Sequence, residues 1–318
     1  MGITAESFRF MLYAASQGVS YDSTLTLGRQ YCFINRSQLG EILGRYDAGC
    51  TPRAVDELDS AINATVPTPG GISLPYSEPL FRYLGARVVD SIDYSDYEGA
   101  TVLHDLNLPV GHELKNKYSC VWDGGLLEHV FNYPTAVKNC MDMTAIGGWL
   151  ILSTPTNNWM GHGFYQFSPE LFFSLLREEN GFSDAAVFMA HRGRWYECVN
   201  PRKLGRRAEL GSPFADRDAI LLHVMARKIA SVPTTLTVMQ SDYETAWAKG
   251  AAGGFSSQPQ AEHKEEAKAV SLGTRIRRAV PESVKRPLRP LYLRLRRAVL
   301  DTKVIIPRDD INSVRKGG

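Results

Sequence analysis

Residues that could do chemistry gather in the stretch CVWDGGLLEHVFN, which spans residues 120–132. An apolar run ends there in Asp123 and two glycines, and Glu128 and His129 follow side by side. Histidine changes its protonation state near neutral pH and can take a proton from a hydroxyl group. An ordinary core strand needs no such ending, so the pattern predicts a strand that stops at a functional edge.

A second histidine stands in a loop of aromatic and amide side chains, NNWMGHGFYQFS at 157–168. We expect His162 to act as a catalytic base, slightly ahead of His129, beneath a loop that covers a polar, ring-shaped acceptor. Alternatively, the aromatic residues only plug the edge of the core and His129 only starts a helix. The side chains expected to bind the acceptor are Glu128, Asn157, Trp159, Tyr165 and Gln166.

The elements that must position these residues are strands ending in acids. Strands are predicted at 23–30, 86–95, 100–107, 118–123 and 149–155, and the second, third and fourth end at Asp93, Asp105 and Asp123. In open parallel sheets, ligands bind beyond the carboxyl ends of the strands. Each acid could instead cap the turn that follows it, because Asp does this well. Three acids in register favour a ligand site.

Strands and helices alternate along the chain. Helices are predicted at 36–46, 53–63, 77–85, 130–143 and 168–181, and two last strands at 184–192 and 219–228. This alternation predicts a doubly wound, mainly parallel α/β sheet of seven strands. We expect strands 86–93 and 118–123 to be parallel neighbours. The expected parts are an N-terminal helical addition at 1–22 and a sheet domain at 23–229 with a helical insertion at 33–85.

From residue 23 to about residue 228 the chain resembles the class I S-adenosylmethionine-dependent methyltransferases. The resemblance rests on IDYSDYEGATVLHDLN, YSCVWDGGLLEHV and AIGGWLILSTPTNNWMGHGFYQFSPELFFSLL. It implies a Rossmann-like methyltransferase fold whose last two strands form an antiparallel edge. It also implies that S-adenosylmethionine is the cofactor. The cofactor-binding residues that it implies are Gly28, Asp93, Asp105, Leu106, Asp123 and Gly124.

The resemblance also implies a role for each of these residues. Asp93 matches the acid that accepts hydrogen bonds from the ribose hydroxyls. Asp105, with Leu106 beside it, matches the acid that meets the adenine amino group. Asp123 and Gly124 match the stretch near the methionine end and the methyl group.

The first glycine motif departs from the family pattern. TLTLGRQ keeps only Gly28 where the family carries an acid and three glycines, with Thr26 in place of the acid. An alternative is therefore a catalytically inactive, methyltransferase-like scaffold, which holds if Arg29 or Gln30 fills the methionine position. The missing glycines also argue against a nicotinamide enzyme, whose pyrophosphate needs them. A sugar-nucleotide transferase is disfavoured because the DRD stretch at 216–218 lies away from the predicted site.

Composition limits the class of protein. Of the 318 residues, 44% are hydrophobic and 22% are charged, which is typical of a globular protein, and no long apolar run predicts a membrane span. The five cysteines form no C-x-x-C pair, so we expect free thiols in a cytoplasmic protein. No zinc-binding pattern is present, and we expect no metal.

Charge separates the end of the chain from the rest. Residues 271–300 carry nine basic side chains against Glu282, a net charge of +8, which leaves −6 for the rest of the chain. We expect a flexible linker at 230–270 and a basic tail at 271–318. The simplest interpretation is a solvated charged extension, and the next is peripheral association of 271–300 with an anionic inner-membrane face through the interleaved apolar residues. Nucleic-acid binding is disfavoured because no base-reading motif accompanies the charge.

The resemblance therefore implies a methyltransferase that O-methylates a small molecule. By resemblance alone, the acceptor is a sugar or glycan-precursor hydroxyl, in polysaccharide biosynthesis.

Overall fold

The computed structural model describes residues 2–47, 49–64, 68–71, 74–204, 218–232, 236–252 and 305–307. The chain forms two compact units. Unit 1 comprises Met1–Cys198, Arg217–Val238 and Pro307–Gly318, and unit 2 comprises Val199–Asp216 and Met239–Ile306. All of the predicted site residues belong to unit 1.

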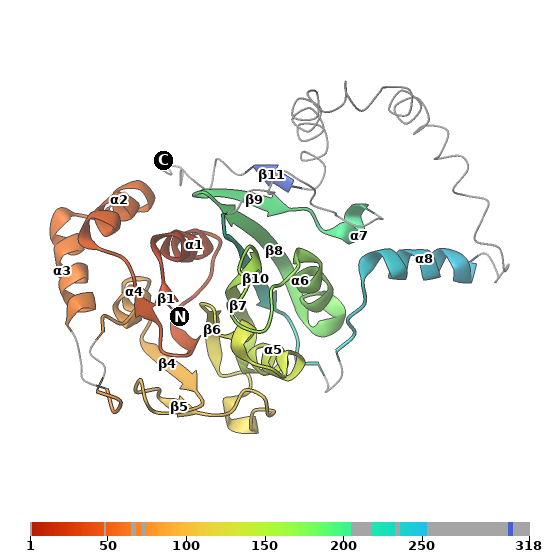
Figure 1. Ribbon diagram of the computed structural model, residues 1–318, viewed down its shortest axis with the longest axis horizontal. Coiled ribbons are helices and arrows are strands. Elements are labelled where there is room, and N and C mark those ends of the chain that lie inside the picture. The colour runs from red at the N-terminus through yellow and green to blue at the C-terminus, as the bar shows by residue number, and fades with distance from the viewer. Residues whose placement is uncertain are drawn as a thin grey trace, which may run out of the picture. The chain divides into compact units, whose positions relative to one another are not determined.

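The main sheet of unit 1 has the order β9-β8-β10-β7-β6-β2-β4-β5 within the described residues (Figure 1). Strand β10 runs antiparallel to both of its neighbours, β9 runs antiparallel to β8, and the other strands are parallel. The fold is thus a doubly wound α/β fold with an antiparallel edge, as predicted. The strands are β2 (Ser23–Leu27), β4 (Val88–Asp93), β5 (Val102–Leu103), β6 (Tyr118–Asp123), β7 (Thr144–Asn157), β8 (Phe182–His191), β9 (Arg194–Cys198) and β10 (Ile220–Lys228).

Two details of the sheet differ from the prediction. Strands β4 and β6 are not direct neighbours, because β2 lies between them and pairs in parallel with each. The sheet also has one strand more than expected, since β9 forms a hairpin with β8. The hairpin turn consists of Arg192 and Gly193, whose φ angles are 53° and 72°. Positive φ at both central residues is the geometry that suits a two-residue hairpin.

Helices cover both faces of the sheet. The first four helices share one buried cluster with Trp122 and Ile151 of the sheet. Helix α5 contacts β6 and β7, yet none of the α5 side chains belongs to this cluster. Since successive strand residues point to opposite faces of a sheet, we infer that α5 packs on the other face. Figure 1 shows α1–α4 on one side of β6 and α5 and α6 on the other. These helices are α1 (Ala5–Ser16), α2 (Arg36–Tyr46), α3 (Pro52–Asn63), α4 (Glu78–Tyr83), α5 (Tyr133–Met143) and α6 (Pro169–Leu175).

Local signals fix the ends of these helices. Asn35 and Gln38 form a reciprocal capping box at the start of α2, and Thr51 caps α3 immediately before Pro52. A short parallel pair, β1 (Gly2–Ile3) with β3 (Tyr31–Cys32), ties the N-terminus to the segment after β2. The predicted helical insertion at 33–85 coincides with α2, α3 and α4.

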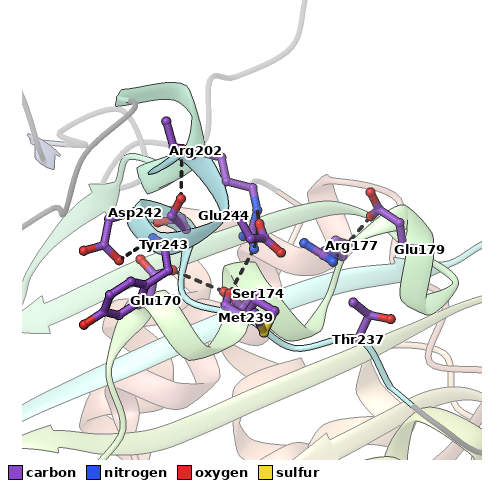
Figure 2. A network of polar contacts seen from close by, with 12 residues as sticks. Glu170, Ser174, Arg177, Glu179, Arg202, Thr237, Met239, Asp242, Tyr243 and Glu244 are labelled. Carbon is purple, nitrogen blue, oxygen red and sulfur yellow. Dashed lines mark hydrogen bonds and ion pairs between the residues drawn. The ribbon is translucent and has the colours of Figure 1, made fainter. Parts of the chain in front are cut away.

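Unit 2 is described in part. Helix α7 (Pro201–Leu204) and helix α8 (Ser241–Ala252) are joined by an ion pair of 2.8 Å between Arg202 and Glu244, which Figure 2 shows. Residues 241–252, expected to be linker, are thus helical. Of the predicted tail only β11 (Ile305–Pro307) is described, and 271–300 lies outside the described residues.

The described residues hold no helix that is long and apolar enough to cross a membrane. All five cysteines are free, and four of them are buried.

The core beneath α1 contains an uncharged histidine. His223 of β10 is fully buried, and its ring stacks on Phe10 of α1 with centroids 4.7 Å apart. Neither ring nitrogen has a hydrogen-bond partner among the described residues. Burial, aided by the charge of Arg9, lowers the pKa of His223 to about 3. The native state therefore holds this side chain in its neutral form.

We predict that His223→Leu makes the protein less sensitive to acid. Because the native pKa lies below the unfolded value, the unfolded state binds the extra proton, and native stability falls as the pH drops below about 6.5. The wild type should lose about 2 kcal/mol between pH 7 and pH 5 through this residue, and the variant should not. Urea unfolding at both pH values measures the difference. His112→Leu, at a fully exposed side chain, is the control. Equal acid sensitivity of wild type and His223→Leu would contradict the assignment.

Candidate functional site

The carboxyl ends of the parallel strands lie level with one another. Leu27 of β2 is paired with Ile92 on one side and Asp123 on the other, and Asp93 is paired with Leu103 of β5. Gly28 follows Leu27 with a φ of 66°, and its amide donates to the carbonyl of Ile92 over 2.8 Å. The ends of β4, β2 and β6 therefore form one continuous edge.

Each of the three predicted acids caps the turn that follows it. Asp93 Oδ1 accepts from the amide of Tyr94 at 2.6 Å. Asp105 Oδ1 accepts from the backbone and side chain of Asn107, and these bonds lower the pKa of Asp105. Asp123 Oδ1 accepts from the amides of Gly125 (3.2 Å) and Leu126 (2.7 Å). The capping role thus holds for one oxygen of each acid.

The next predicted residue, Leu106, is buried, and its carbonyl accepts from the side chain of Asn139 on α5 at 3.2 Å. It follows Asp105 directly in the turn after β5.

Two buried carboxyl groups lie just beyond β6. Asp123 is fully buried and Glu128, in the 3₁₀ turn η2 (Leu127–His129), is 1% exposed. Asp123 Oδ2 and Glu128 Oε2 have no hydrogen-bond partner among the described residues. Burial raises the pKa of both carboxyl groups, and the charge of Asp123 raises that of Glu128 further. The pair therefore retains a proton more readily than exposed carboxyl groups would.

The loop after β7 folds back onto η2. The amide of Phe164 donates to the carbonyl of Glu128 over 2.7 Å. Gly163, with a φ of 74°, approaches so closely that a Cβ atom there would lie 2.8 Å from the Glu128 carbonyl oxygen. This close approach brings His162 to η2.

Glu128, His129 and His162 form one group, which we call the Glu-His-His cluster. His162 Nε2 lies 3.7 Å from Glu128 Oε1, and the two imidazole centroids are 5.0 Å apart. One ligand-type atom from each of the three residues lies within 4.8 Å of the other two. Partial burial, then the neighbouring charge of His162, lowers the pKa of His129 and favours its neutral ring. The two histidines predicted as separate candidates thus belong to one site.

Most of the side chains predicted to bind the acceptor hold the loop itself. Trp159 donates from its indole to the carbonyl of Ile220 at 2.9 Å and from its amide to Gln166 Oε1 at 3.0 Å. Tyr165 donates its hydroxyl to the carbonyl of Phe131 at 2.6 Å. Asn157 ends β7 opposite Ile220. These contacts match the alternative of a structural loop, and they fix the Trp159 ring 5.0 Å from that of His162.

Gln30 is a buried polar residue at the edge that the site prediction did not include. It is 1% exposed, its amide nitrogen donates to the carbonyl of Leu27, and its Oε1 has no partner among the described residues. A Cβ atom on Gly124 would lie 2.4 Å from Gln30 Oε1 and 2.9 Å from Trp122 Nε1. Only a glycine fits at 124 while Gln30 keeps this position. In the sequence, Gln30 is a single polar residue two positions after Gly28, and nothing in this pattern indicates that its side chain is buried.

Arg29, which follows Gly28, is held by residues of other segments. It forms an ion pair with Glu78 at 2.6 Å and stacks 3.8 Å above the ring of Tyr76. Arg29, Tyr76 and Glu78 line a cavity of about 340 Å³ beside the middle of β4. Asp90 and Ser91 of β4 line it as well. Thr26 and Gln30 also line this cavity, whereas the three predicted acids Asp93, Asp105 and Asp123 do not.

No family model matches the chain, and no curated protein matches it either. Among solved structures it is similar to 1,6-didemethyltoxoflavin-N1-methyltransferase of Burkholderia thailandensis, with 14% identity over 71% of this chain and 79% of that one and a TM-score of 0.35. TehB of Haemophilus influenzae has 12% identity over 69% and 62%, with a TM-score of 0.34. Phosphoethanolamine N-methyltransferase 1 of Haemonchus contortus has 11% identity over 84% and 53%, with a TM-score of 0.33. At these values the likenesses carry no argument about activity.

We predict that Gly163→Ala moves His162 away from Glu128, whereas Gly161→Ala does not. Both glycines have positive φ, so each substitution costs about 1–2 kcal/mol in backbone strain. Only the Cβ at 163 also collides with a backbone atom, because nothing lies within 4 Å of a Cβ at 161. Urea unfolding should show the larger loss for Gly163→Ala, and only this variant should shift the NMR signal of the His162 ring. Identical behaviour of the two variants would refute the close packing of the loop.

Proposed function

We propose that the protein is an S-adenosylmethionine-dependent methyltransferase that methylates a hydroxyl group. The observation that carries the proposal is a set of buried polar atoms without partners at the ends of β2 and β6. Buried polar groups are nearly always hydrogen-bonded, so such a set indicates a polar ligand. Within the described residues these atoms are Gln30 Oε1, Trp122 Nε1, Asp123 Oδ2 and Glu128 Oε2.

The donor chemistry of these residues fits the proposed cofactor. Asp93 is half-buried and directly follows Ile92, the residue paired with Leu27. Its carboxylate would accept hydrogen bonds from the ribose hydroxyls. Asp105 and Leu106 would meet the adenine. Gln30 Oε1, beside Gly124, is an acceptor suited to the ammonium group of the methionine end. When bound, the cofactor supplies an electrophilic methyl group on a sulfonium.

The Glu-His-His cluster would handle the proton of the acceptor. In the proposed transfer the acceptor oxygen would form a bond to the methyl carbon as the carbon–sulfur bond breaks, with the electron pair remaining on sulfur. The hydroxyl proton would pass to the imidazole of His162 or His129, because a histidine side chain can accept a proton near neutral pH. Most of the catalysis would come from alignment of the two reactants.

Exposed apolar side chains border the cluster. Met160 and Phe164 in the loop are 95% and 67% exposed, and Phe131 lies edge-on to Phe164 with centroids 5.9 Å apart. These side chains support an acceptor with an apolar or ring-shaped part next to its hydroxyl. We propose a sugar or glycan-precursor acceptor of this kind, in surface-polysaccharide biosynthesis.

A second candidate is the inactive scaffold. The observation in its favour is the placement of Gln30 against Gly124, because this side chain occupies space next to the turn where the methionine end would lie. The two candidates differ in whether Gln30 binds the cofactor or excludes it.

The binding of S-adenosylhomocysteine decides between these candidates. We predict binding to the full chain, and a 10- to 150-fold weaker affinity for Asp93→Ala, because a hydrogen bond to a charged acceptor contributes about 1.5–3 kcal/mol. Isothermal titration measures both affinities. Asp96→Ala, at an exposed acid three residues away, is the matched control and should bind normally. Absence of binding to the wild type favours the scaffold, and normal binding by Asp93→Ala removes Asp93 from the site.

We also propose that residues 271–300 associate with an anionic membrane surface, at the cytoplasmic face where glycan precursors are assembled. Each basic residue near such a surface contributes about 1 kcal/mol, and this attraction weakens with salt. The full chain should co-sediment with vesicles containing phosphatidylserine at low salt. A variant with the nine basic residues of 271–300 replaced by Gln should stay in the supernatant. Equal sedimentation of the two proteins would refute this association.

A further inference from the structure

The Glu-His-His cluster has the donor set of a transition-metal site. Two imidazoles and one carboxylate are a common catalytic ligand set for zinc and for non-haem iron. Two atoms each ~2.1 Å from a tetrahedral ion lie ~3.4 Å apart. Glu128 Oε1 and His162 Nε2 are 3.7 Å apart, and all three ligand-type atoms lie within 4.8 Å of one another. Small side-chain rotations would complete this geometry.

The burial of Glu128 provides an independent observation. Its side chain is 1% exposed, and Oε2 has no hydrogen-bond partner among the described residues. A buried carboxylate is costly without a cation or strong donors around it. The carboxyl group of Asp123, also buried, adds to the negative potential at this point. A positive ion at this point would offset the cost of burying the Glu128 carboxylate and its repulsion by Asp123.

We propose that Glu128, His129 and His162 bind a divalent transition-metal ion of the zinc type. Two of the three ligands are imidazoles, which suit zinc and its neighbours but not Mg²⁺ or Ca²⁺, whose ligands are oxygens. Glu128 and His129 come from η2, whereas His162 comes from the loop after β7. The ion therefore fastens this loop to the end of β6.

Three protein ligands leave a tetrahedral ion one open position. Both histidines are exposed, whereas Glu128 is buried, so the open position faces the outside of the edge, where the exposed Phe164 lies. This location suits an acceptor molecule that arrives from solvent.

The role of the ion rests on the proposed function. An acceptor hydroxyl bound at the open position loses its proton to solvent more easily, because the ion stabilises the resulting oxyanion. The oxygen then attacks the methyl carbon, the carbon–sulfur bond breaks, and S-adenosylhomocysteine is released. In this state His162 is a ligand and no longer the free base.

Metal binding is tested on the full chain after treatment with EDTA and gel filtration. Titration with Zn²⁺ should show a saturable site, and Co²⁺ at the same site should give visible absorption bands typical of low-symmetry coordination. Glu128→Gln and His162→Gln should each weaken Zn²⁺ binding at least tenfold and abolish these bands. His162 is exposed, so its variant should fold normally even if the buried Glu128→Gln does not, as circular dichroism will report.

The matched control is His112→Gln. His112 Nδ1 lies 3.6 Å from Glu113 on the surface, a His-Glu pair without a third ligand, and this variant should bind Zn²⁺ like the wild type. The proposal fails if the wild type binds no Zn²⁺, if neither cluster variant weakens binding, or if His112→Gln weakens it as much. S-adenosylhomocysteine is titrated separately in EDTA. If the protein binds Zn²⁺ but not S-adenosylhomocysteine, the metal site stands and the methyltransferase proposal fails. If it binds S-adenosylhomocysteine but not Zn²⁺, only the metal-site proposal fails.

Discussion

The backbone amide of Phe164 donates a hydrogen bond to the carbonyl of Glu128, and this bond joins two loops that follow neighbouring strands. One loop carries Glu128 and His129, and the other carries His162. Together with the hydrogen bond from Tyr165 to the carbonyl of Phe131, the bond from Phe164 holds the two histidines side by side. The bond in turn depends on Gly163, because any larger residue would push the loops apart.

The buried acid Asp123 has a structural role in addition to the binding role proposed for it. Asp123 uses Oδ1 to close the turn after β6 and leaves Oδ2 buried without a partner among the described residues. Removal of this carboxyl would therefore loosen the turn that carries Glu128. A substitution at Asp123 would thus disturb the structure as well as any proposed ligand contact, whereas Asp93 is only half-buried and its loss should disturb the structure less.

The sequence predicted the strands near the site because their signals are local. The apolar run of β6 ends at Asp123, the residue where the predicted strand ends, and the helices begin at recognisable caps such as Asn35 and Ser168. Strand β9 was missed because Arg192-Gly193 is not one of the usual two-residue hairpin sequences, such as Asn-Gly or Asp-Gly. The burial of Gln30 could not be predicted, because it depends on contact with Gly124, far along the chain. The metal-type cluster was missed for the same reason, since His162 stands 33 positions after His129 and forms no local motif with it.

Strand β7 reaches past the end of its neighbour β6. Asp123 is paired with Leu152, yet β7 continues to Asn157, supported on its other side by β10. A bulge opposite Ile220 and Leu221 leaves Thr156 out of the pairing, and its hydroxyl donates instead to the carbonyl of Phe167 at the far end of the loop. The irregularity thus closes the base of the loop that carries His162. A shift in the pairing of β10 would therefore move the loop that carries His162, without any substitution in the loop itself.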